Sequence, residues 1–114
     1  MKNLLKETLE ILKENNKTEE DVLWCSVTDI DEYHHDFENA KEGYFGFEEF
    51  KKWADKNYDS GYGGQEVHPR LFIVGKDFWL ERHEYDGSEW WEFKTMLLKP
   101  EKEVELSNRF IFEN

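Results

Sequence analysis

Two stretches of the chain carry hydrophobic residues at helical spacing. In residues 3–15, Leu5, Leu9 and Leu12 share one row, with Leu4 and Ile11 on the neighbouring rows. This period predicts an amphipathic helix that ends near Asn15 or Asn16, since asparagine can adopt a left-handed cap. The polar residues that we expect to face outward are Lys6, Glu7, Glu10, Lys13 and Glu14.

The second helical pattern covers residues 45–57, "FGFEEFKKWADKN", where Phe47, Phe50, Trp53 and Ala54 fall on one face. We expect this face to pack on a sheet. Between the two helices, residues 21–29 form an apolar, β-branched run that predicts a buried strand. Residues 29–42 hold six acids without strict periodicity and predict an exposed loop.

The second half of the chain alternates in the manner of strands. Residues 58–70 contain three glycines and a proline, which predict a turn-rich connector. Strands are predicted over 71–75, 78–85 and 88–95, and the last two are joined by Asp86-Gly87, a strong signal for a type I′ turn. Residues 103–114 offer a further strand pattern, which Arg109 interrupts.

The order of these elements predicts a single α+β domain over residues 1–114. Two helices should pack on one face of a small, mostly antiparallel sheet, in the order α-β-α-β-β-β with an extra strand if the C-terminal pattern pairs.

A two-residue turn also fixes which residues of the late hairpin face each other, and directly opposed residues share a face. One face should meet the helices, because it is mostly apolar: Phe78, Leu80, Arg82, Trp91 and Phe93. The other face presents Trp79, Glu81, His83, Tyr85, Trp90, Glu92 and Lys94. A three-residue loop would shift this register and undo the pairing.

Two pairs follow from this register. Arg82 faces Trp91, a cation–π pair if the arginine is partly exposed. Glu81 faces Glu92, which destabilises the strand pair unless another group compensates.

The composition of the chain narrows the classes of function that it can have. Twenty-seven acids against fifteen bases give a formal charge of −12. Such a chain repels phosphates, which disfavours direct binding to nucleic acid or to an anionic membrane. The charge serves solubility alone or attracts a protein partner with a basic surface. Cys25, the only cysteine, predicts a buried thiol and no internal disulfide. With no apolar run of membrane length and no signal-peptide pattern, we expect a cytoplasmic protein.

The candidate partner-binding residues are the acids of the predicted loop and the mixed face of the hairpin. They are Asp29, Asp31, Glu32, Asp36, Glu38, Trp79, Glu81, His83, Tyr85, Trp90 and Glu92. Acids supply charge, and tryptophan and tyrosine supply the large contacts that dominate interfaces.

Enzymatic signals are weak, and no cofactor is predicted. The chain lacks the GxGxxG, P-loop and HExxH motifs and an EF-hand, and its serines lie in no nucleophile elbow. The alternative is a small metal-binding protein or metal-dependent hydrolase that uses Glu81, His83 and Glu92, or His34 and His35, whose spacing matches no known ligand pattern. A structural or assembly factor is a third alternative.

Residues 58–95, with "GGQEV", "IVG" and "WLERHEYDGSEWWEF", resemble small proteins encoded by bacteriophages and prophages of Gram-positive bacteria. The resemblance implies a phage context, and hence the host cell cytoplasm, but supplies no activity and no site residues. Small acidic phage proteins often block host enzymes, including defence nucleases, so by this analogy we expect an inhibitor that occupies a basic surface.

Overall fold

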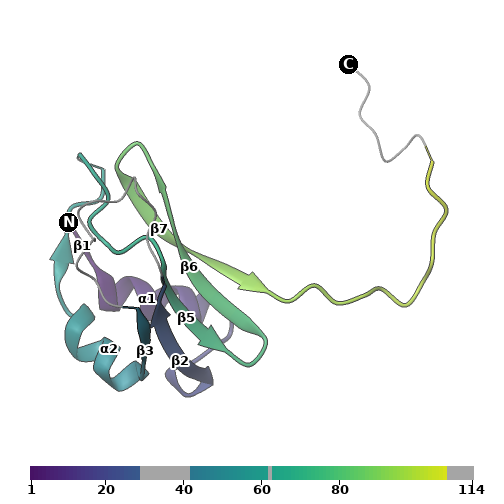
Figure 1. Ribbon diagram of the computed structural model, residues 1–114, viewed down its shortest axis with the longest axis horizontal. Coiled ribbons are helices and arrows are strands. Elements are labelled where there is room, and N and C mark those ends of the chain that lie inside the picture. The colour runs from purple at the N-terminus through teal and green to yellow at the C-terminus, as the bar shows by residue number, and fades with distance from the viewer. Residues whose placement is uncertain (29–41, 62, 108–114) are drawn as a thin grey trace.

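The computed structural model describes residues 1–28, 42–61 and 63–107, which fold into two helices and two sheets (Figure 1). The helices are α1 (Leu4–Glu14) and α2 (Phe47–Ala54), and Glu19–Asp21 form a short 3-10 turn. The main antiparallel sheet has the strand order β3-β2-β5-β6-β7. Its strands are β2 (Val22–Val27), β3 (Gly43–Phe45), β5 (Leu71–Gly75), β6 (Phe78–Tyr85) and β7 (Ser88–Thr95).

A second sheet pairs the two short strands β1 (Lys2–Asn3) and β4 (Asn57–Tyr58). Side chains from both helices and from the main sheet form one core cluster, so the α+β prediction is confirmed. Strands β1, β3 and β4 have only two or three residues each and left no usable pattern in the sequence.

Helix α1 begins where Asn3 Oδ1 accepts a hydrogen bond from the Lys6 amide at 3.0 Å. It ends before Asn16, which adopts a left-handed φ of 60° as expected. The fully buried residues of α1 are Leu4, Thr8 and Leu12, so the helix is rotated slightly from the row Leu5, Leu9 and Leu12, of which Leu12 alone is fully buried. Leu5 and Leu9 are only partly buried.

The rotation of α1 has a polar cause. The Trp91 indole donates a hydrogen bond to Thr8 Oγ1 at 2.8 Å, and this hydroxyl donates to the Leu4 carbonyl at 2.7 Å. The same rotation turns Glu7 inward, against the prediction that it faces solvent. A hydroxyl fully satisfied in this way can replace an apolar side chain in the core.

Helix α2 and strand β2 are both shorter than predicted. Phe45 lies in β3 rather than in the helix, and Trp53 is 47% exposed although it was expected to pack inward. In β2 only Cys25 is buried, whereas Leu23 is 63% and Trp24 42% exposed, so the prediction of a buried strand is wrong for most of β2. Burial raises the pKa of the Cys25 thiol to about 12.

The late hairpin has the predicted register in full. Asp86 and Gly87 both have positive φ, at 52° and 86°, as a type I′ turn requires. Glu81 therefore faces Glu92, and Arg82 faces Trp91.

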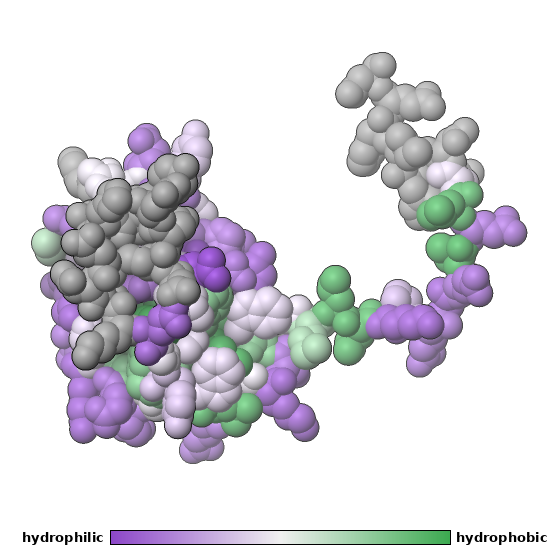
Figure 2. All heavy atoms as spheres, in the orientation of Figure 1, coloured by the Kyte–Doolittle hydropathy of each residue, from purple (hydrophilic) through white to green (hydrophobic). Residues whose placement is uncertain are grey.

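The chain after β7 runs away from the domain (Figure 1). Its apolar side chains stand apart from the body in Figure 2, and Leu97 is 99% exposed. Of the residues predicted to add a C-terminal strand, 103–107 form no strand. Residues 108–114, which include Arg109, lie outside the described part of the chain.

The packing of the hairpin on β5 can be tested by a substitution at Gly75. A Cβ at this position would lie 2.0 Å from Cε1 of the buried Phe78 ring, which stacks on Phe93. We therefore expect Gly75→Ala to lower the free energy of unfolding in urea by about 1–3 kcal/mol. Gly64→Ala is the matched control, because a Cβ there meets no atom within 4 Å. Equal stability of the two variants would contradict this packing.

Candidate functional site

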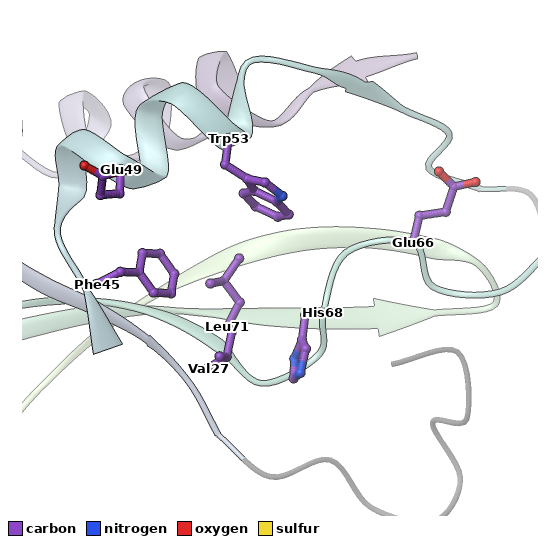
Figure 3. A pocket seen from close by; sticks show the side chains of 7 residues that line it. All are labelled: Val27, Phe45, Glu49, Trp53, Glu66, His68 and Leu71. Atoms are coloured by element: carbon purple, nitrogen blue, oxygen red, sulfur yellow. The ribbon is translucent and has the colours of Figure 1, made fainter. Parts of the chain in front are cut away.

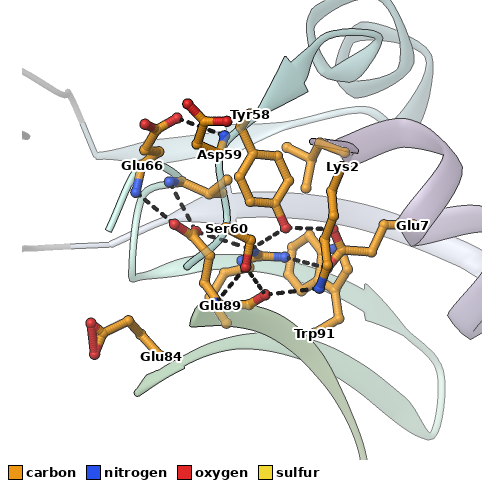
Figure 4. Close-up of polar contacts among 12 residues, drawn as sticks. Lys2, Glu7, Tyr58, Asp59, Ser60, Glu66, Glu84, Glu89 and Trp91 are labelled. Atoms are coloured by element: carbon orange, nitrogen blue, oxygen red, sulfur yellow. Dashed lines mark hydrogen bonds and ion pairs between the residues drawn. The ribbon is translucent and has the colours of Figure 1, made fainter. Parts of the chain in front are cut away.

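A buried ion-pair cluster, formed by Glu7, Tyr58, Arg82 and Glu89, lies under the hairpin (Figure 4). The Arg82 side chain has no exposure, and its Nη2 donates to Glu89 Oε1 at 3.0 Å and to the Tyr58 hydroxyl at 3.1 Å. Its Nη1 donates to Glu7 Oε1 at 3.2 Å. One guanidinium therefore joins α1, β4, β6 and β7.

Glu89 also holds the glycine-rich connector in place. Its two carboxylate oxygens accept hydrogen bonds from the backbone amides of Glu66, at 2.7 Å, and Val67, at 3.1 Å. The Glu89 amide donates to Ser60 Oγ at 2.9 Å. Lys2 Nζ donates to the Glu89 carbonyl at 3.3 Å. Every oxygen of this carboxylate has a partner inside the protein, so its role is structural.

The Trp91 ring packs against the guanidinium of this cluster, where one nitrogen lacks a hydrogen-bond partner. Arg82 Nε is the one buried side-chain N or O atom, among the described residues, that has no hydrogen-bond partner. The guanidinium lies 4.7 Å from the centre of the Trp91 ring, which provides a cation–π contact. The predicted Arg82–Trp91 pair is thus confirmed, but the arginine is buried rather than partly exposed. Burial and the hydrogen bond to Glu7 raise the pKa of Tyr58, although Arg82 opposes this.

The opposite side of the hairpin is the outer face, formed by Trp79, Glu81, His83, Tyr85, Trp90, Glu92 and Lys94. Here His83 lies between the two opposed glutamates, with Nε2 at 2.8 Å from Glu81 and Nδ1 at 2.6 Å from Glu92. Both nitrogens of the imidazole ring thus lie within hydrogen-bond distance of a carboxylate oxygen. His83 is therefore the group that lies between Glu81 and Glu92, whose opposition was predicted to destabilise the strand pair.

Tryptophans border these charges. The Trp79 indole donates to Glu81 Oε1 at 2.7 Å, and Trp90 stacks beside His83 with ring centres 6.3 Å apart. Trp90 is 36% exposed, Trp79 is partly buried and Tyr85 is 77% exposed. The structure thus brings together all six hairpin residues that the sequence suggested for partner binding.

The outer face continues across the sheet, because cross-strand neighbours share a side. Val74 is paired with Trp79 and with Trp24, and Phe72 is paired with Glu81. Trp24 is 42% exposed, and Tyr44 on β3 is also exposed. The side chains of α1 and α2 pack on the other side of the sheet, with the core.

The acids predicted to act with this face fall outside the described residues. They are Asp29, Asp31, Glu32, Asp36 and Glu38, together with His34 and His35 of the alternative metal site.

The metal hypothesis also named Glu81, His83 and Glu92. Within the described part of the chain, no group of three or more histidine, cysteine, aspartate or glutamate side chains is placed to hold a metal ion. Both nitrogens of His83 instead face carboxylate oxygens, at 2.8 Å from Glu81 and 2.6 Å from Glu92.

An apolar pocket of about 500 Å³ lies between α2 and the sheet (Figure 3). Trp53 projects into it from α2, while Glu66 and His68 come from the connector. The other lining residues are Val27, Phe45, Glu49 and Leu71. No sequence pattern predicted this pocket, because its walls come from β2, β3, α2, the connector and β5.

Sequence reasoning also missed Glu7, Tyr58 and Glu89. A signal did exist for Glu89, because the predicted register puts it on the same side as Arg82 and Trp91. An acid there has to pair with the arginine.

No family model, curated protein or solved structure matches this chain. Among the residues described, no helix has the length and apolar character needed to cross a membrane.

The buried pair of Arg82 and Glu89 can be tested by an isosteric change. Glu89→Gln leaves a buried guanidinium without its closest carboxylate, and we expect it to lower the free energy of unfolding by about 3 kcal/mol. Glu84→Gln is the matched control, because Glu84 lies directly opposite Glu89 and is exposed. Urea denaturation of both variants gives the comparison. A Glu89→Gln protein as stable as the control would refute the structural role of the pair.

The outer face predicts a pH effect. Burial raises the pKa of Glu81, but hydrogen bonds from Trp79 and His83 outweigh it and hold the pKa below its ordinary value of 4.5. Ionised Glu81 therefore stabilises the fold above pH 4.5, and this contribution is lost as the pH falls through the lowered pKa. Urea unfolding at a series of pH values should show that wild type exceeds Glu81→Gln in stability by an amount that shrinks below this pH. A difference independent of pH would be inconsistent with this linkage.

Proposed function

We propose that this protein is a non-enzymatic, acidic protein-binding module that occupies a basic surface of its partner. The observation that carries the proposal is the outer face, where partly exposed tryptophans border a fixed arrangement of Glu81, His83 and Glu92. Aromatic side chains provide the large contacts typical of binding hot spots, and carboxylates provide complementarity to lysine and arginine.

The rigidity of the face supports the same function. Directly behind it, Arg82 and Glu89 tie the hairpin to α1, β4 and the connector. A surface that is ordered before binding loses less conformational entropy when the complex forms. This rigid backing suits a module that presents a fixed pattern of charges and rings.

The net charge of −12 supports the choice of partner class. It favours encounter with a cationic surface and disfavours direct contact with phosphates. Nucleic-acid-binding proteins carry such surfaces, and the resemblance to phage proteins points to a host or defence protein of this kind. On this proposal, the protein acts as an inhibitor in the cytoplasm of the host cell.

Capture from a host lysate, measured by quantitative mass spectrometry, tests this function. A basic protein retained at about 50 mM salt should be released at about 500 mM, because screening removes the attraction. Trp90→Ala should reduce its capture about tenfold or more, as expected for a hot-spot residue.

Trp53→Ala is the matched control, because Trp53 is 47% exposed and lies on α2, away from the outer face. It should leave capture unchanged. Capture that resists salt, or that Trp90→Ala and Trp53→Ala affect equally, would argue against the proposal.

A further inference from the structure

Among the strands that the structure describes, β7 is an edge of the main sheet and pairs with β6. In a hairpin with a two-residue turn, the residues that flank the turn exchange hydrogen bonds, and alternate pairs follow along the ladder. Residues 90, 92 and 94 therefore bond to β6, whereas the backbone groups of residues 89, 91, 93 and 95 point to the free edge. The contacts of Glu89 agree, since its amide and carbonyl bond Ser60 and Lys2 instead of β6.

Beyond Glu89, no described residue pairs with this edge. In residues 1–28, 42–61 and 63–107, no hydrogen bond is made by the outward amides and carbonyls of Trp91, Phe93 and Thr95. An exposed row of this kind is a template for pairing with another strand. The length of the open edge, from Trp91 to Thr95, is enough for a short ladder.

We propose that β7 pairs antiparallel with β7 of a second copy of this chain, with Phe93 at the two-fold axis. Trp91 of each copy then faces Thr95 of the other, and the three outward-pointing pairs allow about six backbone hydrogen bonds. The two five-stranded sheets become one continuous sheet. An isologous contact of this type closes on itself and leaves no further β7 edge open.

Charge complementarity selects this register. With Phe93 on the axis, Glu92 of each copy lies directly opposite Lys94 of the other, which gives two attractive pairs. Two neighbouring registers also keep the outward-pointing backbone groups of the two copies paired. One places Glu92 opposite Glu92 of the other copy, and the other places Lys94 opposite Lys94. Both juxtapose like charges, which are destabilising.

The chain beyond β7 adds an apolar contact in the same register. Met96, 64% exposed, falls opposite the partly exposed Trp90 of the second copy. The ladder stops there, because Ser60 and Lys2 already occupy the next backbone groups at Glu89. The dimer thus uses an edge and leaves most of the outer face accessible, so it does not depend on the proposed function.

Sedimentation velocity over a series of protein concentrations tests the dimer, at about 150 mM salt to screen the repulsion between two acidic chains. Thr95→Pro removes one outward amide from an exposed position and should weaken the dimer at least tenfold, while Thr95→Ala keeps the amide and should not. A wild type that stays monomeric, or one that dimerises equally well with proline at position 95, overturns the proposal.

Charge reversal tests the register itself. Lys94→Glu alone makes glutamate face glutamate, and Glu92→Lys alone makes lysine face lysine, so each should weaken the dimer about tenfold. An equal mixture of the two variants restores both attractive pairs and should form a heterodimer. A mixture no more associated than either variant alone overturns the register, as would dimers unaffected by either change.

Discussion

The buried contact between Arg82 and Glu89 is the constraint to which the rest of the fold is fitted. Moving both charges out of water costs several kcal/mol for each, and their mutual attraction repays this only if their remaining hydrogen-bonding groups are also satisfied. Here Glu89 accepts hydrogen bonds from two consecutive backbone amides, and Arg82 donates to Glu7 and to the Tyr58 hydroxyl and packs on the Trp91 ring. The inward position of Glu7 and the path of the connector are both coupled to these contacts.

Strand alternation gives the hairpin two unlike polar groups, one on each side. Arg82 and His83 are neighbours in sequence, yet the arginine points into the core and the histidine points toward solvent. Each lies beside a tryptophan and contacts two glutamates. Burial separates their environments, because the Arg82 side chain has no exposure while that of His83 is 36% exposed.

Much of this arrangement was predictable from the sequence. The Asp86-Gly87 turn determined the register, and the register determined which residues share each side of the hairpin. The helices were located by their period, but the face of α1 was not, because adjacent leucines at positions 4 and 5 offer two nearly equal rows. Contacts between distant segments determine which of the two rows is buried. The inward position of Glu7 depends on Arg82, 75 residues later, so no local pattern indicates it.

Cys25 illustrates how the core limits chemistry as well as packing. Its thiol is buried in the middle of the sheet, opposite Phe45 on one side and Ile73 on the other. Because the reactive species is the thiolate, a pKa of about 12 keeps the sulfur inert while the strands stay closed. Its modification by an alkylating reagent therefore requires the sheet to open, and the rate of that reaction reports how often β2 separates from its neighbours.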